Sequence, residues 1–112
     1  MPQFILHQKA YDFLLWLYPV INRLPKNYRH SLGRQLEQTG FSLLLYLIQA
    51  NNSRGDTRAA YQKEASTALD VLHIFLRLTK DLHLISVKQY IEGSEKLNEL
   101  GLMLSSWMKP AR

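Results

Sequence analysis

The chain lacks several residues and segments on which common classes of protein depend. Its 112 residues include no cysteine, which excludes a disulfide framework and a thiolate metal site and suits a reducing compartment. The N-terminus has neither the positive region nor the cleavage signature of a signal peptide. The longest apolar runs, near residues 13–21 and 41–48, are far shorter than the roughly 20 residues that span a bilayer. We therefore expect a cytoplasmic protein that does not insert into a membrane.

Motifs for common enzyme chemistry are also missing. The sequence has no Gly-rich phosphate loop, no cysteine nucleophile and no haem-attachment motif. Asp70 and His73 have the i, i+3 spacing of two metal ligands, but a di-iron bundle needs such a pair from each of two helices. With Glu37 they define one alternative, a metal-bundle enzyme. We predict instead a protein without catalytic residues, metal or cofactor.

What the sequence does contain is apolar residues at helical spacing in four segments. The predicted helices span about 4–24, 26–50, 57–82 and 87–108, and the second begins at either Lys26 or Ser31. Pro19 predicts a kink in the first helix, or a break. Pro25, a turn-rich segment at 51–56 and a capping box from Ser86 to Gln89 separate the helices. Short connections favour an all-α, antiparallel up-down-up-down four-helix bundle, forming one domain over residues 1–112.

Each predicted helix has one apolar stripe for the core of this bundle. In the first helix the stripe is Leu6, Ala10, Phe13, Leu17, Ile21 and Leu24. In the second it is Leu32, Leu36, Gly40, Leu43 and Leu47. In the last, a heptad-like seam is Val87, Tyr90, Ser94, Leu97, Gly101, Leu104 and Met108. We expect the small residues Gly33, Gly40, Ser94 and Gly101 to allow close approach of a neighbouring helix.

The first two helices carry additional apolar residues away from the core stripe. A helix that is apolar on two opposite sides is buried on both, and so short a chain has only one core of its own. We therefore predict that copies of the chain associate. The predicted subunit interface consists of Phe41, Leu45 and Ile48 of the second helix and Tyr11, Leu15 and Tyr18 of the first.

Positive charge indicates the second kind of partner. The formal net charge is +5, which favours polyanions such as nucleic acid, although Lys and Arg also simply solvate helix surfaces. One basic cluster surrounds the start of the second predicted helix. Another lies on the third predicted helix, to which Arg54 and Arg58, in and just after the preceding loop, are added. The predicted nucleic-acid-binding residues are Lys26, Arg29, Arg34, Arg54, Arg58, His73, Arg77 and Lys80.

Four stretches of the chain, taken in order, resemble one family. They are residues 12–19 (DFLLWLYP), the junction 24–36 with Leu24-Pro25-Lys26 and Leu32-Gly33, residues 75–90 with FLRLTKDL and Lys88-Gln89-Tyr90, and residues 101–107 with GLML and Trp107. The pattern is similar to the accessory variability determinant (Avd) proteins of diversity-generating retroelements. These belong to a wider group of four-helix bundles that includes proteins encoded by intervening sequences of 23S rRNA genes.

The resemblance implies properties that periodicity does not give. It implies a homopentameric barrel that binds the reverse transcriptase of the retroelement and its template-repeat RNA or DNA, and so supports mutagenic cDNA synthesis and retrohoming. It places the polymerase chemistry in the partner and matches Arg29, Arg34, Arg77 and Lys80 to basic positions of the family. The alternative is a structural or adaptor bundle of the intervening-sequence type, with a protein partner and no nucleic-acid role.

Overall fold

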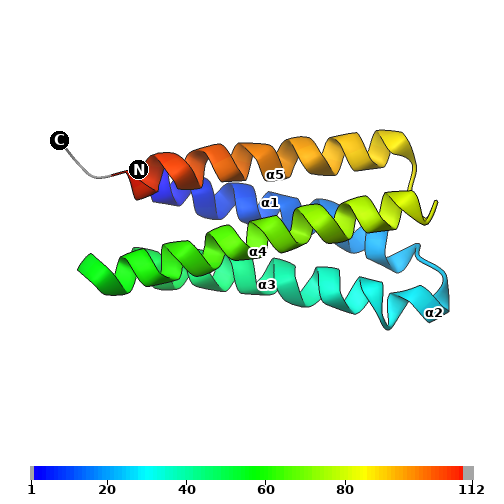
Figure 1. Ribbon diagram of the computed structural model, residues 1–112, viewed down its shortest axis with the longest axis horizontal. Helices are drawn as coiled ribbons and strands as arrows, with labels where there is room; N and C mark the ends of the chain where they lie inside the picture. Colours follow the sequence, from blue (N-terminus) through cyan, green and yellow to red (C-terminus); the bar gives the residue numbers. More distant parts are fainter. Residues whose placement is uncertain (1, 110–112) are drawn as a thin grey trace.

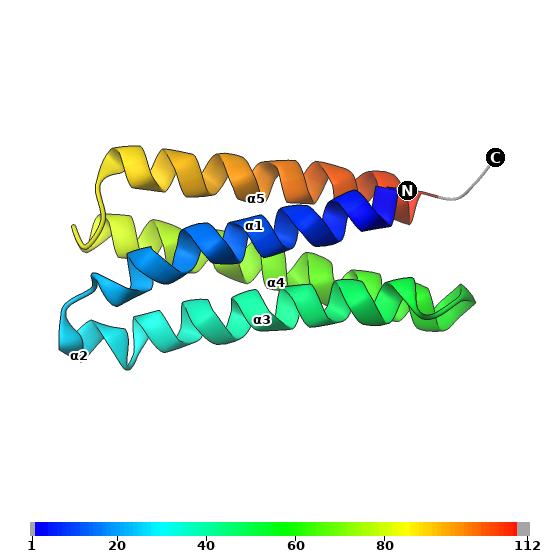
Figure 2. The same ribbon diagram turned by 180° about the vertical axis from the view of Figure 1, so that it is seen from behind.

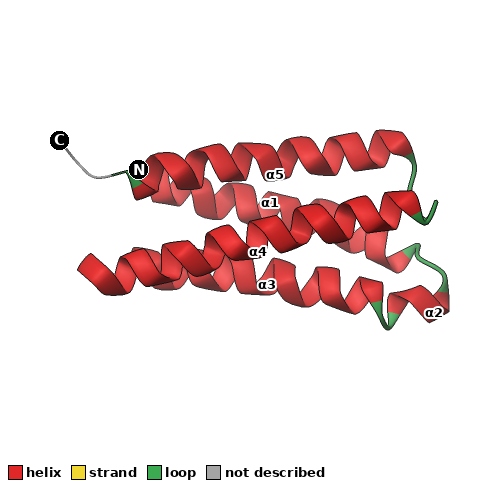
Figure 3. Cartoon of the chain, viewed as in Figure 1, coloured by secondary structure: helices red, strands yellow, loops and turns green. Residues whose placement is uncertain are grey.

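The computed structural model describes residues 2–109, with side chains from residue 5 onward. Over these residues it is entirely helical, with four long helices and one short one (Figures 1 and 3). The helices are α1 (Pro2–Asn22), α2 (Lys26–Arg29), α3 (Leu32–Asn51), α4 (Gly55–Asp81) and α5 (Val87–Met108).

The long helices form the predicted antiparallel up-down-up-down bundle. α1 packs against α3 and α5, and α4 packs against the same two helices from the opposite corner (Figures 1 and 2). Helices adjacent in sequence are thus adjacent in space, as short connections require. One end of the bundle holds the end of α1, α2, the start of α3, the end of α4 and the start of α5.

The predicted core stripes of the first two long helices are confirmed. The five predicted core residues within α1 are buried, and so is Leu24 just after its end, as are all five of α3. A Cβ atom on Gly40 would lie only 2.7 Å from Leu14 Cδ2, and one on Gly33 would lie 3.2 Å from Ile21 Cγ2. Both glycines therefore lie at close contacts between α3 and α1, as expected, and the contact at Gly40 is the tighter.

The predicted seam of α5 is partly wrong. Val87 and Met108, the first and last residues of the helix, are exposed, and no atom lies within 4 Å of a Cβ placed on Gly101. Leu97 and Leu104 of the predicted seam are buried, as predicted, and the other buried residues of α5 are Gly93 and Leu100. A Cβ on Gly93 would lie 2.6 Å from the ring of Trp16, so the small residue at the tightest contact is Gly93.

The connections differ from the predictions by a few residues. The sequence left two starts open for the second predicted helix, Lys26 and Ser31. The structure has a helix at each, since α2 begins at Lys26 and α3 begins directly after Ser31, with a turn at His30 and Ser31 between them. α1 continues through Pro19 to Asn22 without a break. α4 is preceded by Arg54 and begins at Gly55, whose φ of 57° lies in the left-handed region that suits glycine.

The capping box at the start of α5 is confirmed. The Gln89 backbone N–H donates to Ser86 Oγ at 3.0 Å, and the Ser86 N–H donates to Gln89 Oε1 at 2.9 Å. These two bonds satisfy backbone donors that the first turn of a helix leaves unpaired. They fix the start of α5 beside the end of α4, at the same end of the bundle as α2.

Candidate nucleic-acid interface

The antiparallel arrangement brings the two predicted basic clusters to the same end of the bundle. Residues 23–36 pass from α1 through α2 into α3, and residues 71–91 run from the C-terminal part of α4 into α5; both segments reach the end marked by α2 in Figure 1. We call these two segments the basic end. They contain seven Lys or Arg and one Asp, against seven Lys or Arg and eight Asp or Glu in the rest of the chain. The net positive charge therefore comes from one end.

The cations of this end are Arg23, Lys26, Arg29, Arg34, Arg77, Lys80 and Lys88. Asp81 is the one carboxylate among them and is shared: Lys80 Nζ lies 3.1 Å from it and Arg77 Nε 3.7 Å. Lys80 Nζ also lies 4.7 Å from the centroid of the Tyr90 ring, a cation–π distance. One carboxylate leaves most of this charge uncompensated.

The structure does not bring Arg54 and Arg58 together with the other predicted nucleic-acid-binding residues. They lie at the start of α4, and at 1.5 Å per residue Arg54 is roughly 35 Å along the helix from Arg77. Arg58 Nε donates to the carbonyls of Ala50 and Ser53 at 3.0 and 2.9 Å. Its guanidinium also lies over the Trp107 ring, 5.6 Å from the centroid. Arg58 therefore joins α3, α4 and α5, which sequence spacing could not reveal.

Arg29 combines a structural contact with an exposed position. Its guanidinium donates through Nε and Nη2 to the Leu24 carbonyl, at 3.4 and 3.3 Å, while the residue as a whole is exposed. These bonds hold the side chain against the joint between α1 and α2. An arginine has five N–H donors, so others remain for an anion.

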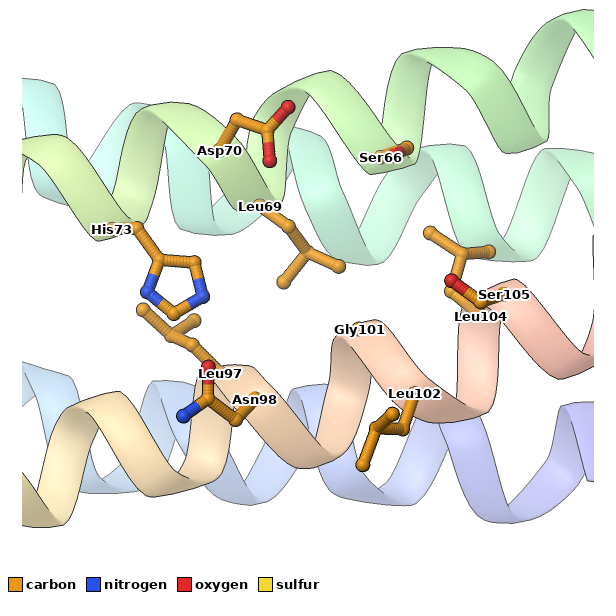
Figure 4. Close-up of a pocket in the computed structure, with 10 residues that line it drawn as sticks. All are labelled: Ser66, Leu69, Asp70, His73, Leu97, Asn98, Gly101, Leu102, Leu104 and Ser105. Carbon is orange, nitrogen blue, oxygen red and sulfur yellow. The ribbon is translucent and has the colours of Figure 1, made fainter.

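His73 lies in a groove between α4 and α5, at the inner limit of the basic end. Figure 4 shows its ring pointing toward Leu97 and Asn98 of α5. Asp70 and His73 both line this groove, whereas Glu37 is on α3 and hydrogen-bonds Tyr18 of α1. The three residues of the metal-bundle alternative therefore do not converge. Among the described residues, no three His, Asp or Glu side chains are grouped to hold a metal ion.

The residues of the predicted subunit interface lie on α1 and α3, and five of the six are exposed. Phe41 and Leu45 of α3 are 51% and 54% exposed, and Tyr11 and Leu15 of α1 are 50% and 59% exposed. Tyr18 is half-buried, with its ring centroid 6.0 Å from that of Phe41. We call the six residues Tyr11, Leu15, Tyr18, Phe41, Leu45 and Ile48 the α1/α3 face. Its role in association stays a prediction.

Tyr18 is the residue of this face whose pKa is shifted from its ordinary value. Partial burial raises the pKa of its phenol above the ordinary value, and the hydrogen bond to Glu37 raises it further. Burial disfavours the charged phenolate, and so does a neighbouring carboxylate. The phenol is therefore neutral at physiological pH and adds no charge to the α1/α3 face.

Sequence reasoning missed two cations and one pocket at the basic end. Arg23 follows the end of α1, and Lys88 lies in the first turn of α5. These two positions are at the same end of the bundle only because the helices are antiparallel. The pocket lies between α3 and α4 beside Tyr28 of α2. The available signal was the antiparallel topology itself, which places the start of α3 beside the end of α4.

Fold and surface together define an antiparallel helical bundle with a basic end and an uncovered apolar face. Residues 4–111 match the model of the bAvd-like family, and the chain belongs to this family. The resemblance to Avd proteins is thereby confirmed.

One solved structure shows the same fold. It is a protein of unknown function from the S23 ribosomal protein family of Bacteroides thetaiotaomicron, which superposes with a TM-score of 0.90. The match covers 98% of this chain and 100% of the other at 16% identity, so it supports the shared fold alone. No curated protein matches the sequence. In the described part of the chain, no helix has both the length and the apolar character needed to cross a membrane.

Proposed function

We propose that this protein is a non-enzymatic, cytoplasmic accessory factor of a diversity-generating retroelement. In this role it binds the reverse transcriptase and the template-repeat RNA or DNA, and supports mutagenic cDNA synthesis and retrohoming. Membership of the bAvd-like family supports the role as a whole. The observation that carries the nucleic-acid part is the basic end, with seven Lys or Arg and one Asp.

Phosphate binding follows from this charge distribution. Each Lys or Arg that neutralises a phosphate releases a condensed counterion, so affinity falls steeply with salt and depends little on sequence. The α1/α3 face extends the effect, because copies that associate through it bring several basic ends into one field. A homopentamer, the form implied by the family resemblance, would multiply the charge fivefold.

The test compares equal charge changes at the two ends of the bundle. The double variant Arg34→Gln with Arg77→Gln alters the basic end, and Arg54→Gln with Lys63→Gln is its control at the other end. For single-stranded RNA, the slope of log affinity against log salt changes by about 0.7 per lost phosphate contact. We expect the slope to become shallower by about 1.4 for the first variant and to stay unchanged for the control. Equal losses would contradict a localised interface.

The apolar α1/α3 face also supports a second candidate, a structural or adaptor bundle that binds only protein. Its five exposed residues suit a protein partner as well as another copy. Absence of RNA binding at low salt, with retained binding to the reverse transcriptase, would favour this candidate. Co-purification of the tagged protein with a retroelement reverse transcriptase tests the partnership directly.

A further inference from the structure

A shallow pocket, wide open to solvent, lies at the basic end between α3 and α4, beside Tyr28 of α2. Tyr28, Leu32, Gln35, Phe75, Leu78 and Leu82 line it, and its volume is about 380 Å³. We propose that this basic-end pocket receives one unpaired base of a single-stranded nucleic acid whose phosphates lie on the surrounding cations. This inference rests on the proposed function and adds to it the form of the nucleic acid and the place where a base is held.

The walls of the pocket suit the flat face of a base. Tyr28 and Phe75 are half-buried aromatic residues on different helices, and Leu32 beside them is buried. Leu78 and Leu82, on the same side of α4, are 42% and 44% exposed. Aromatic side chains bind bases by stacking whatever the sequence, because every base has a π-face. The apolar walls therefore supply contacts that a phosphate cannot use and a base can.

The pocket also offers a polar group for the edge of a base. Gln35 is an exposed residue of α3 that lines the pocket. Its amide provides two N–H donors and a carbonyl acceptor, the combination with which glutamine pairs with base edges. Ser31 Oγ, which also lines the pocket, donates toward the Asn27 carbonyl at 3.2 Å and can still accept a bond.

Charge next to the pocket determines which kind of ligand fits. Lys26 and Arg29 belong to the same short helix as Tyr28, and Arg34 immediately precedes Gln35. Residues 23–36 contain no Asp or Glu. A single strand bound to these cations through its phosphates leaves its bases free. One of these bases can therefore turn into the pocket while the phosphates keep their contacts. In a duplex the bases are paired and stacked, and none is available to enter.

An acidic, amphipathic protein segment is the competing occupant. Specific protein–protein interfaces bury above about 1,000 Å², whereas this pocket has the size of a small-molecule site. Two aromatic walls and an amide within that volume match a single planar ring better than a helix. The structure therefore favours the base, and the peptide is an outcome of the test.

The experiment separates base recognition from phosphate binding. Four fluorescein-labelled probes are compared by anisotropy at several salt concentrations. They are a 12-nucleotide RNA single strand, the same strand with abasic sites throughout, an RNA duplex of the same length, and an acidic amphipathic peptide. The protein variants are Tyr28→Ala, Tyr28→Phe and Leu78→Ala. Ile74→Ala is the matched control, since Ile74 is an exposed apolar residue of α4 that does not line the pocket.

We expect Tyr28→Ala to weaken binding of the normal strand about fivefold or more, with no change for the abasic strand or in the salt slope. Tyr28→Phe keeps the ring and should keep the affinity. Should Tyr28→Ala lose helicity by circular dichroism, Leu78→Ala replaces it, with about a twofold loss expected against none for Ile74→Ala.

Two results would overturn the inference while leaving the proposed function intact. One is equal affinity of the unaltered protein for the normal and abasic strands. The other is a loss of acidic-peptide binding, but not of RNA binding, on Tyr28→Ala. Failure of every RNA probe to bind at low salt would overturn both the inference and the nucleic-acid role.

Discussion

Helix α1 has two outer sides that differ sharply in character. Toward α3 it presents Tyr11 and Leu15, both at least half exposed, beside Phe41 and Leu45. Toward α5 it presents Lys9, whose Nζ lies 3.3 Å from Glu99. A shallow, mainly polar depression follows on that side, lined by Trp16, Lys96 and three glutamates of α5. One helix thus borders both an apolar and a polar surface. Exposed apolar residues also lie on α4 and α5, but five are grouped on the α1/α3 face, and such a grouping is typical of an interaction surface.

The largest expected effect comes from placing charge on the apolar side. Phe41→Glu with Leu45→Glu would put two carboxylates on the α1/α3 face, where association would have to remove them from water at high cost. We expect sedimentation velocity to show loss of any assembly and a single species of 13.1 kDa. Leu102→Glu is the control, because Leu102 is 74% exposed and lies beside the α4–α5 groove. Assembly that survives the double variant would remove the distinction between the two sides.

The next effect tests the packing of α1 against α5. Gly93→Ala would place a Cβ 2.6 Å from the Trp16 ring and 2.7 Å from Leu76 Cδ2, and we expect it to lower the free energy of unfolding by about 1–3 kcal/mol. Gly101→Ala in the same helix meets no atom within 4 Å, and should raise it by up to about 1 kcal/mol through helix propensity. Urea unfolding measures both, and changes of the same sign would show that α5 is rotated from the position described.

A smaller effect is expected at the ion pair on the polar side of α1. The Lys9 and Glu99 side chains are 40% and 52% exposed, and exposed pairs contribute at most about 1 kcal/mol. Glu99→Gln should therefore change the thermal midpoint by no more than a few degrees, and should not alter assembly. A large change in calorimetry would mean that this side, too, is covered by a partner.

The smallest effect concerns the protonation of Tyr18. Its pKa is raised in the folded protein by burial and by Glu37, so the folded state holds the phenolic proton more tightly than the unfolded chain. The resulting stabilisation is present below pH about 10 and is lost as the pH rises through the folded pKa. Tyr18→Phe should remove part of the absorbance change at the alkaline end of a phenolate titration. A loss of absorbance change from the lower-pH part of the titration would contradict the raised pKa of Tyr18.

Helical periodicity was enough to predict most of the fold. Leu6 to Leu24 and Leu32 to Leu47 recur at three- and four-residue steps with few rivals, so the buried sides of α1 and α3 followed directly. In α5 the pattern admitted two registers, because Val87 and Met108 extend one apolar stripe while Leu100 belongs to another. Tertiary contact with Trp16 decides between them, and periodicity contains no information about that contact.

The candidate site was predictable only in part. Sequence order shows that Arg29 and Arg34 are close, and likewise Arg77 and Lys80, but the meeting of these pairs depends on antiparallel packing. Arg58 is bound by backbone carbonyls at the C-terminal end of α3, which have no partner within the helix because α3 ends at Asn51. The sequence alone does not show which side chain reaches them. The residues of the α1/α3 face could be predicted because helical spacing already assigns a complete core stripe to each helix. Apolar residues at other positions of the same helix then stand out in the sequence.

The most direct test of the account is the mass of the unaltered protein at micromolar concentration. An uncovered apolar surface across α1 and α3 should make copies associate, so static light scattering should give a mass several times 13.1 kDa. A mass of 13.1 kDa with no dependence on concentration would contradict the account, since the basic ends of separate copies would then never share one field.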